Sequence, residues 1–196
     1  MNLWNPDFTR ISYLSYGNER QKDAYRVLTD GKIMDILQYY HPVLVGTVPI
    51  GIDLPGSDLD ILCEVHDFHR FEELIFLSFQ DCDEFRYSSK TVNGIPRVVV
   101  NFRCGGWPIE IFGQPVPTTR QNGYKHMIVE HRILQIWGNS GRRMIRDLKS
   151  RGFKTEPAFA KLLKLEGDAY DTLLKMYDWE QDKLTDYLRS VAHDTV

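Results

Sequence analysis

Two short segments of the sequence alternate acidic and branched apolar residues in the same way. Residues 58–61 read Asp-Leu-Asp-Ile, and residues 109–111 read Ile-Glu-Ile. Side chains two apart on a β-strand point to the same face, so Asp58 and Asp60 project together while their apolar neighbours enter the core. Two carboxylates this close repel each other unless a cation lies between them. The pattern predicts strands that carry carboxylates on one face, and Glu110 joins the aspartates if its strand lies beside theirs.

The segments around these strands predict a mixed order of helices and strands. Asn-Gly is the preferred pair for a two-residue type I′ turn, so a hairpin is expected around residues 93–94. From Asn122 onward the apolar spacing is helical. The expected helices are 21–40 with a weak point at Gly31, 67–79, 122–137, 141–149, one capped by Thr155, and one from Asp168 with an apolar stripe through Leu188; the expected strands are 43–45, 59–65, 85–92, 98–102 and 109–112.

These elements predict an α/β (α+β) chain with a short mixed sheet and flanking helices, followed by a C-terminal helical bundle. We expect a catalytic domain over residues 1–117 and a helical region over residues 118–196 packed on it. The 196 residues are enough to bury a hydrophobic core without staples. The Pro-rich stretch at residues 115–120 is the expected joint.

Composition narrows the classes of partner. The net charge is −3, whereas a protein that mainly grips nucleic acid usually presents a basic surface. Three widely spaced cysteines without a CxxC pair argue against a zinc site or a disulfide framework. The N-terminus has no apolar segment of the secretory type, and no window reaches the length of a membrane span. We therefore expect a cytoplasmic protein with reduced thiols.

The segment before the first acidic pair predicts an anion-binding turn. Gly46 and Thr47 follow a short apolar run, and a loop rich in Gly and Pro leads from them to Ser57. A glycine lets backbone N–H groups approach a triphosphate closely, and the two hydroxyls can add contacts. Carboxylate oxygens suit Mg²⁺, and three of them can hold two metal ions about 4 Å apart. The alternative is that Asp58 and Asp60 simply open an exposed strand after a turn.

This arrangement resembles the DNA polymerase β-like nucleotidyltransferase superfamily. The resemblance rests on Val-Gly-Thr at residues 45–47, Asp-Leu-Asp-Ile at residues 58–61 and Ile-Glu-Ile at residues 109–111. It implies that Asp58 and Asp60 bind both metal ions and that Glu110 binds the one that activates the acceptor hydroxyl. Glu110 stands where the superfamily more often has Asp. Nearly the whole chain also looks like uncharacterised bacterial proteins that carry a domain of unknown function within that superfamily.

The resemblance implies a nucleotidyltransferase-like fold and a two-metal enzyme that uses Mg²⁺ or Mn²⁺. The expected reaction moves a nucleoside monophosphate from a nucleoside triphosphate to a hydroxyl acceptor. Charge and size favour a small-molecule or protein acceptor over nucleic acid. Two rivals stay open: a metal-dependent phosphohydrolase with the same carboxylates, and a nucleotide-binding or protein-interaction module of the same fold without turnover.

Two polar clusters in the C-terminal half have both structural and functional interpretations. His126 and Glu130 are four apart on a predicted helix and are followed by His131, which favours an ordinary polar pair over a metal site or a phosphate contact. A basic run at residues 142–146 favours a solvated helix face, with contact to an anionic substrate as the alternative.

Overall fold

The computed structural model describes residues 6–193, with side chains through Val191. Contacts divide the chain into two compact units. The sheet unit comprises Met1–Pro49 and Pro55–Tyr124, and the helical unit comprises Ile50–Leu54 and Lys125–Val196. The short loop 50–54 therefore belongs to the helical unit, although both of its flanks belong to the sheet unit. The packing of region 118–196 on the catalytic domain stays a prediction.

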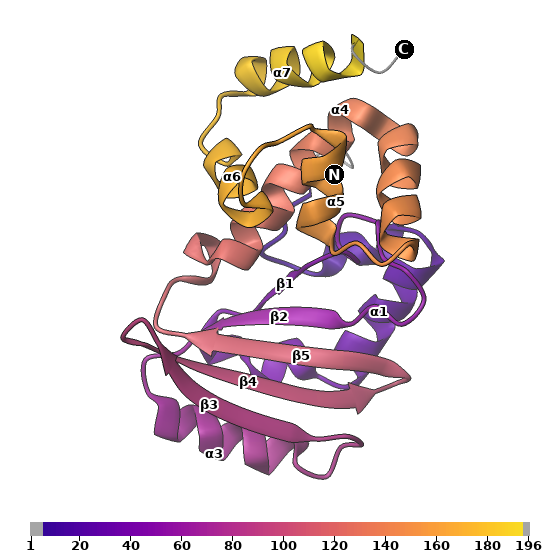
Figure 1. Cartoon of the computed structure of the whole chain (residues 1–196). Coiled ribbons are helices and arrows are strands. Elements are labelled where there is room, and N and C mark those ends of the chain that lie inside the picture. The colour runs from indigo at the N-terminus through magenta and orange to yellow at the C-terminus, as the bar shows by residue number, and fades with distance from the viewer. Residues whose placement is uncertain (1–5, 194–196) are drawn as a thin grey trace. The chain divides into compact units, whose positions relative to one another are not determined.

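The sheet unit is built on a five-stranded mixed sheet in the order β1-β2-β5-β4-β3 (Figure 1). Its central pair, β2 and β5, is parallel, and the other neighbours are antiparallel. The strands are β1 (Val43–Val45), β2 (Leu59–Glu64), β3 (Arg86–Val92), β4 (Ile95–Cys104) and β5 (Trp107–Gln114). The predicted hairpin is confirmed, because Asn93 and Gly94 both have positive φ between β3 and β4, as a type I′ turn requires.

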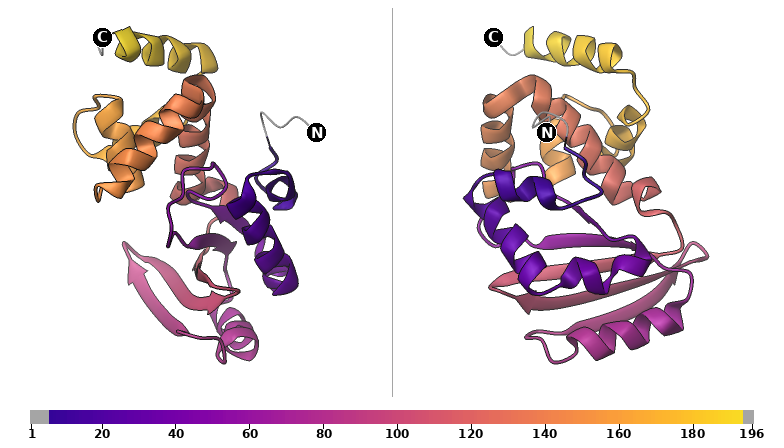
Figure 2. Two further views of the ribbon diagram at one scale, coloured as in Figure 1. Left: turned by 90° about the vertical axis from the view of Figure 1, so that its right-hand side faces the viewer. Right: turned by 180° about the vertical axis from the view of Figure 1, so that it is seen from behind.

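Helices cover one face of this sheet, as the turned views show (Figure 2). The helices of the sheet unit are η1 (Ser12–Tyr16), α1 (Glu19–Asp30), α2 (Ile33–Ile36), η2 (Gln38–Tyr40), α3 (Phe68–Phe79) and η3 (Thr118–Arg120). The helix expected over residues 21–40 is interrupted at Gly31, as predicted. Asp67 caps α3 by accepting a hydrogen bond from the Arg70 N–H.

The core of the sheet unit lies between α1, α3 and that face. Alternate residues of the three central strands point into it, including Ile61 of β2, Val100 of β4 and Ile111 of β5. Leu28 of α1 and Phe71 of α3 are also fully buried there. Because side chains alternate along a strand, the residues between these apolar ones project to the opposite face of the sheet. The α/β class is confirmed.

The helical unit consists of α4 (Asn122–Ser150), whose first three residues belong to the sheet unit, and α5 (Thr155–Leu162), α6 (Ala169–Met176) and α7 (Gln181–His193). Helix α4 bends sharply at Gly138, whose φ of 61° and ψ of −147° are not helical, so the predicted break is confirmed (Figure 1). No helix in the described residues combines the length and hydrophobicity that a membrane span needs. All three cysteines are free, and Cys63 is buried.

The structure corrects the sequence prediction at two places in the helical unit. The apolar stripe from Asp168 to Leu188 is not one helix, because α6 ends at Met176 and α7 begins at Gln181. The Arg132 guanidinium donates to the carbonyl oxygens of Tyr177 and Trp179, at 3.1 and 2.6 Å, and so satisfies backbone groups that the break leaves without helical partners.

The second correction concerns the start of α5. Thr155 is its first residue, and Lys154 occupies the N-cap position without a side-chain cap. Asp168 caps α6 as predicted, accepting from the Asp171 N–H.

A buried acid lies in the helical unit. Glu130 of α4 is 3% exposed, and His126, one turn earlier, is 7% exposed. The Nδ1 atom of His126 is buried without a hydrogen-bond partner, and the polar pair expected from the spacing stays a prediction. Burial raises the pKa of Glu130 well above its usual value, and the charge of Glu156 acts in the same direction. Burial also lowers the pKa of His126, so burial disfavours the charged form of both side chains.

The raised pKa of Glu130 makes the stability of the chain depend on pH. The folded state keeps this proton where the unfolded state has lost it, so stability declines as pH rises above the ordinary value of 4.5. Gln is close in shape to a protonated carboxyl, and we expect Glu130→Gln to remove much of that decline. Melting temperatures measured from pH 5 to 9 test this, with the exposed Glu166→Gln as control. A curve for Glu130→Gln parallel to wild type would contradict it.

Candidate functional site

Two of the predicted carboxylates stand side by side in the sheet. Strands β2 and β5 pair in parallel with Asp60 opposite Glu110, between the buried pairs Leu59–Ile109 and Ile61–Ile111. Paired residues of neighbouring strands point to the same face, about 5 Å apart at the backbone. Asp60 and Glu110 therefore both project from the face opposite the core. The prediction that Glu110 joins the aspartates depended on these two strands being neighbours, and the structure pairs them.

The third carboxylate, Asp58, lies just before β2 and is exposed. The negative charge of Asp58 acts on the carboxyl group of Glu110. Burial raises the pKa of Glu110 above its ordinary value, and the negative charge of Asp58 raises it further. Glu110 is half-buried, so water screens this repulsion only in part. Glu110 is thus paired with Asp60 on one side and feels the negative charge of Asp58.

Gly46 lies directly against this charge. It follows β1, whose last residue Val45 pairs with Asp60, and its φ is +81°. A Cβ placed on Gly46 would overlap carboxylate oxygen Oδ2 of Asp60. Both observations require glycine here: an L side chain rarely adopts this φ, and the Asp60 oxygen occupies the space. The backbone is therefore bare beside the acidic pair, as a phosphate-binding turn needs.

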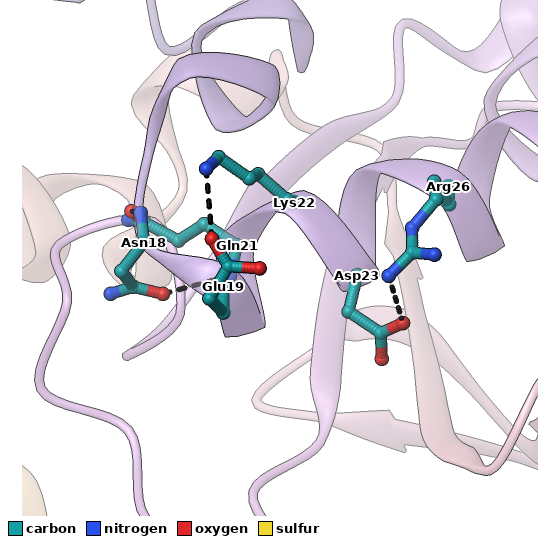
Figure 3. Close-up of polar contacts among 6 residues, drawn as sticks. All are labelled: Asn18, Glu19, Gln21, Lys22, Asp23 and Arg26. Atoms are coloured by element: carbon teal, nitrogen blue, oxygen red, sulfur yellow. Dashed lines mark hydrogen bonds and ion pairs between the residues drawn. The ribbon is translucent and has the colours of Figure 1, made fainter.

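The loop from Gly46 to Asp58 is held by a side chain that sequence patterns did not single out. The Gln21 amide donates from Nε2 to the carbonyl oxygens of Val48 and Pro49, at 2.9 and 3.1 Å. Its Oε1 accepts from the Asn18 N–H, and its own N–H donates to Asn18 Oδ1, completing a capping box at the start of α1 (Figure 3). Gln21 thus fastens the loop to the end of a helix. The capping box could have been read from the sequence, but the loop contact could not.

Three other polar residues predicted from the sequence, namely His131, Arg142 and Arg146, have structural partners. His131 is buried and lies 2.8 Å, through Nε2, from the Gln135 amide. Arg142 donates to the Leu134 carbonyl, at 3.3 Å, and Arg146 donates to the Gly51 carbonyl, at 2.6 Å. Arg143 is exposed. The basic run is therefore not one solvated face, because two of its three guanidinium groups bond backbone oxygens.

The donor set fits a hard divalent cation. Asp58, Asp60 and Glu110 offer only carboxylate oxygens, which Mg²⁺ and Mn²⁺ prefer. Within the described residues, no group of three or more His, Cys, Asp or Glu side chains is placed so that it could hold a metal ion. The pKa of Glu110 is raised by burial and then by the charge of Asp58, and a cation at this place would offset that charge.

Solved structures of similar fold include RNA-modifying polymerases. A mutant of the Cid1 poly(U) polymerase bound to MgATP has a TM-score of 0.50 at 13% identity, over 85% of this chain and 54% of that one. A cytoplasmic RNA terminal U-transferase has 0.47 at 14%, over 86% and 51%. The polymerase core of TRAMP, an RNA surveillance complex, has 0.43 at 12%, over 92% and 60%. This chain thus spans roughly half the length of these proteins.

At such identity the similarity shows the fold alone, and that fold is nucleotidyltransferase-like. No curated protein matched the sequence. The family described as "Domain of unknown function (DUF4269)" matches residues 26–176, which is most of the chain. The chain therefore belongs to the DUF4269 family.

Proposed function

We propose that this protein is a metal-dependent nucleotidyltransferase that moves a nucleoside monophosphate from a nucleoside triphosphate to a hydroxyl group. The observation that carries the proposal is the pairing of Asp60 with Glu110 on adjacent parallel strands, with the Asp58 charge acting on Glu110. The nucleotidyltransferase-like fold supports it.

Each part of the site has a defined task in this proposal. Asp58, Asp60 and Glu110 would hold Mg²⁺ or Mn²⁺, which when bound neutralises phosphate charge and activates the acceptor hydroxyl. The bare backbone at Gly46 admits the triphosphate, and the hydroxyls of Thr47 and Ser57 orient it. Nucleotidyl transfer depends mainly on positioning and charge neutralisation, and these residues provide both without a covalent intermediate.

The acceptor is a small molecule or a protein in this proposal. The net charge of −3 favours an acceptor that is not a polyanion. RNA is the competing acceptor, because structures of similar fold include a poly(U) polymerase and an RNA terminal U-transferase. Incubation with labelled triphosphate and either oligonucleotide or cell metabolites separates the two classes by the product that carries label.

A non-catalytic nucleotide-binding module is the second candidate. It is favoured by one observation, namely that no group of three or more His, Cys, Asp or Glu side chains in the described part of the chain is placed so that it could hold a metal ion. Such a module binds nucleotide equally well with and without a divalent cation, whereas the transferase needs the cation to offset its three carboxylates.

Calorimetry with ATP, GTP, CTP and UTP tests the proposal. We expect wild type to bind at least one triphosphate with Mg²⁺ and much more weakly with EDTA. Asp58→Ala combined with Asp60→Ala removes the oxygens that the cation needs, so we expect metal-dependent binding to disappear. Glu64→Ala, at the other end of β2, is the control and should bind normally. Binding by wild type that is unaffected by EDTA would favour the module instead.

Gly46→Ala tests the turn. The added methyl group must displace the Asp60 carboxylate, and alanine at this φ costs about 1–2 kcal/mol. We expect a lower melting temperature, and an affinity for nucleotide that is weaker than that of wild type by about tenfold or more. Gly94→Ala is a matched control, because Gly94 has a φ of +77° with open space around it. It should lose stability through strain alone and keep its affinity. Equal loss of affinity in both variants would show that Gly46 has no special part in binding.

Glu110→Gln separates stability from activity. Burial and the charge of Asp58 disfavour the ionised form of Glu110. The neutral amide of Gln should therefore raise the melting temperature of the metal-free protein. It should also lower the rate of transfer by about a hundredfold or more, because one carboxylate oxygen donor is lost. Thermal melts with EDTA and a pyrophosphate-release assay measure the two effects. A variant that is less stable without metal would contradict the electrostatic interpretation of the site.

A further inference from the structure

The loop between the two catalytic segments is unusually buried. Val48 and Ile50 are 1% and 3% exposed, and Ile52 and Asp53 are 0% and 6% exposed. Loops normally run over the surface, because a buried loop must find partners for backbone groups that no ladder or helix satisfies. Gln21 satisfies the carbonyls of Val48 and Pro49. The next carbonyls in the loop need donors of their own.

Two cations of α4 supply those donors. Arg146 Nη2 lies 2.6 Å from the Gly51 carbonyl oxygen, and Lys149 Nζ lies 3.1 Å from that of Ile52. The two side chains are three residues apart and therefore share one side of the helix. Both are half-buried, which strengthens a hydrogen bond from a charged donor and makes its loss costly.

We propose that Arg146 and Lys149 are positioning residues that fix the loop joining Gly46–Thr47 to Ser57–Asp58. Both ends of this loop carry residues of the proposed nucleotide-binding site. The conformation of the loop therefore decides where the Gly46–Thr47 turn and Asp58 lie. The claim that this positioning serves nucleotide binding rests on the proposed function. The claim that the two cations order the loop does not.

The contacts explain why the loop belongs to the helical unit while its flanks belong to the sheet unit. They also give the basic run of α4 a role other than phosphate contact, because the Arg146 guanidinium is directed to a backbone oxygen. Arg143, three residues earlier and exposed, makes no such bond and provides a matched comparison on the same helix.

Hydrogen exchange measured by mass spectrometry on the full chain tests the ordering of the loop without nucleotide. Arg146→Met and Lys149→Met each remove one charged donor, and we expect peptides covering residues 46–58 to exchange about tenfold faster or more. Peptides from β4 should be unchanged. Arg143→Met should match wild type everywhere, and Arg146→Lys, which keeps a charged donor, should restore part of the protection.

Three outcomes overturn the ordering claim. Exchange in residues 46–58 that matches wild type in both folded Met variants would show that the bonds do not order the loop. Exchange that rises equally in β4 would show a general loss of stability. Arg146→Lys that behaves as Arg146→Met would show that the charged donor is not what matters. If Arg146→Met fails to fold, Lys149→Met and Arg146→Lys decide the claim.

Steady-state kinetics tests whether the loop positions the proposed nucleotide-binding site. We expect the KM for the triphosphate to rise about tenfold in the Met variants, with a smaller change in kcat and recovery in Arg146→Lys. Faster exchange with an unchanged KM would overturn the positioning role. If wild type binds no triphosphate, the proposed function fails, and the positioning of a nucleotide-binding site fails with it. The exchange data still decide whether Arg146 and Lys149 order the loop.

Discussion

The candidate site depends on one register: the parallel pairing of β2 with β5 that sets Asp60 opposite Glu110. The flanking leucine and isoleucines fix this register, because a slip of either strand by one residue would bury the carboxylate of that strand and expose its apolar residues. Core packing therefore enforces an unfavourable arrangement of like charges. The pKa of Glu110 is raised first by its burial and second by the negative charge of Asp58.

The second constraint is the segment that leads from β1 to β2. Gly46 must stay bare, because the Asp60 carboxylate fills the place of a Cβ. Beyond it the loop is buried, and its carbonyls are bonded by Gln21 from α1 and by Arg146 and Lys149 from α4. In the proposed site, these contacts order the loop before a ligand binds, which lowers the entropic cost of binding.

Much of the sheet could be predicted from the sequence because its signals are local. Alternation over residues 58–61 and 109–111 identified β2 and β5, and the Asn-Gly pair identified the hairpin. The sequence could not predict that β2 and β5 are neighbours, because pairing between strands about fifty residues apart leaves no local pattern. The convergence of Glu110 with the aspartates was therefore predicted only on the condition that the two strands pair. The break after Met176 was missed for a related reason: the Arg132 guanidinium that satisfies its carbonyls lies more than forty residues away.

The candidate site was predicted only in part, for the same physical reason. Carboxylates and a glycine-containing turn are recognisable by type and spacing, so Asp58, Asp60, Glu110 and Gly46 could be named. The partners of the loop could not, because Gln21 looks like a capping residue and Lys149 like a solvated one. The burial of Glu130 was missed likewise: its spacing to His126 predicts a polar pair, but packing within the helical unit decides how deeply that pair is buried.

The most direct test of the account is a crystal structure with Mn²⁺ and a non-hydrolysable nucleoside triphosphate, with manganese located by its anomalous signal. We expect manganese bound by carboxylate oxygens of Asp58 and Asp60 at the start of β2 and of Glu110 on β5, with the triphosphate against the backbone of Gly46 and Thr47. Nucleotide bound away from that turn, or manganese absent from the three carboxylates while nucleotide is present, would contradict it.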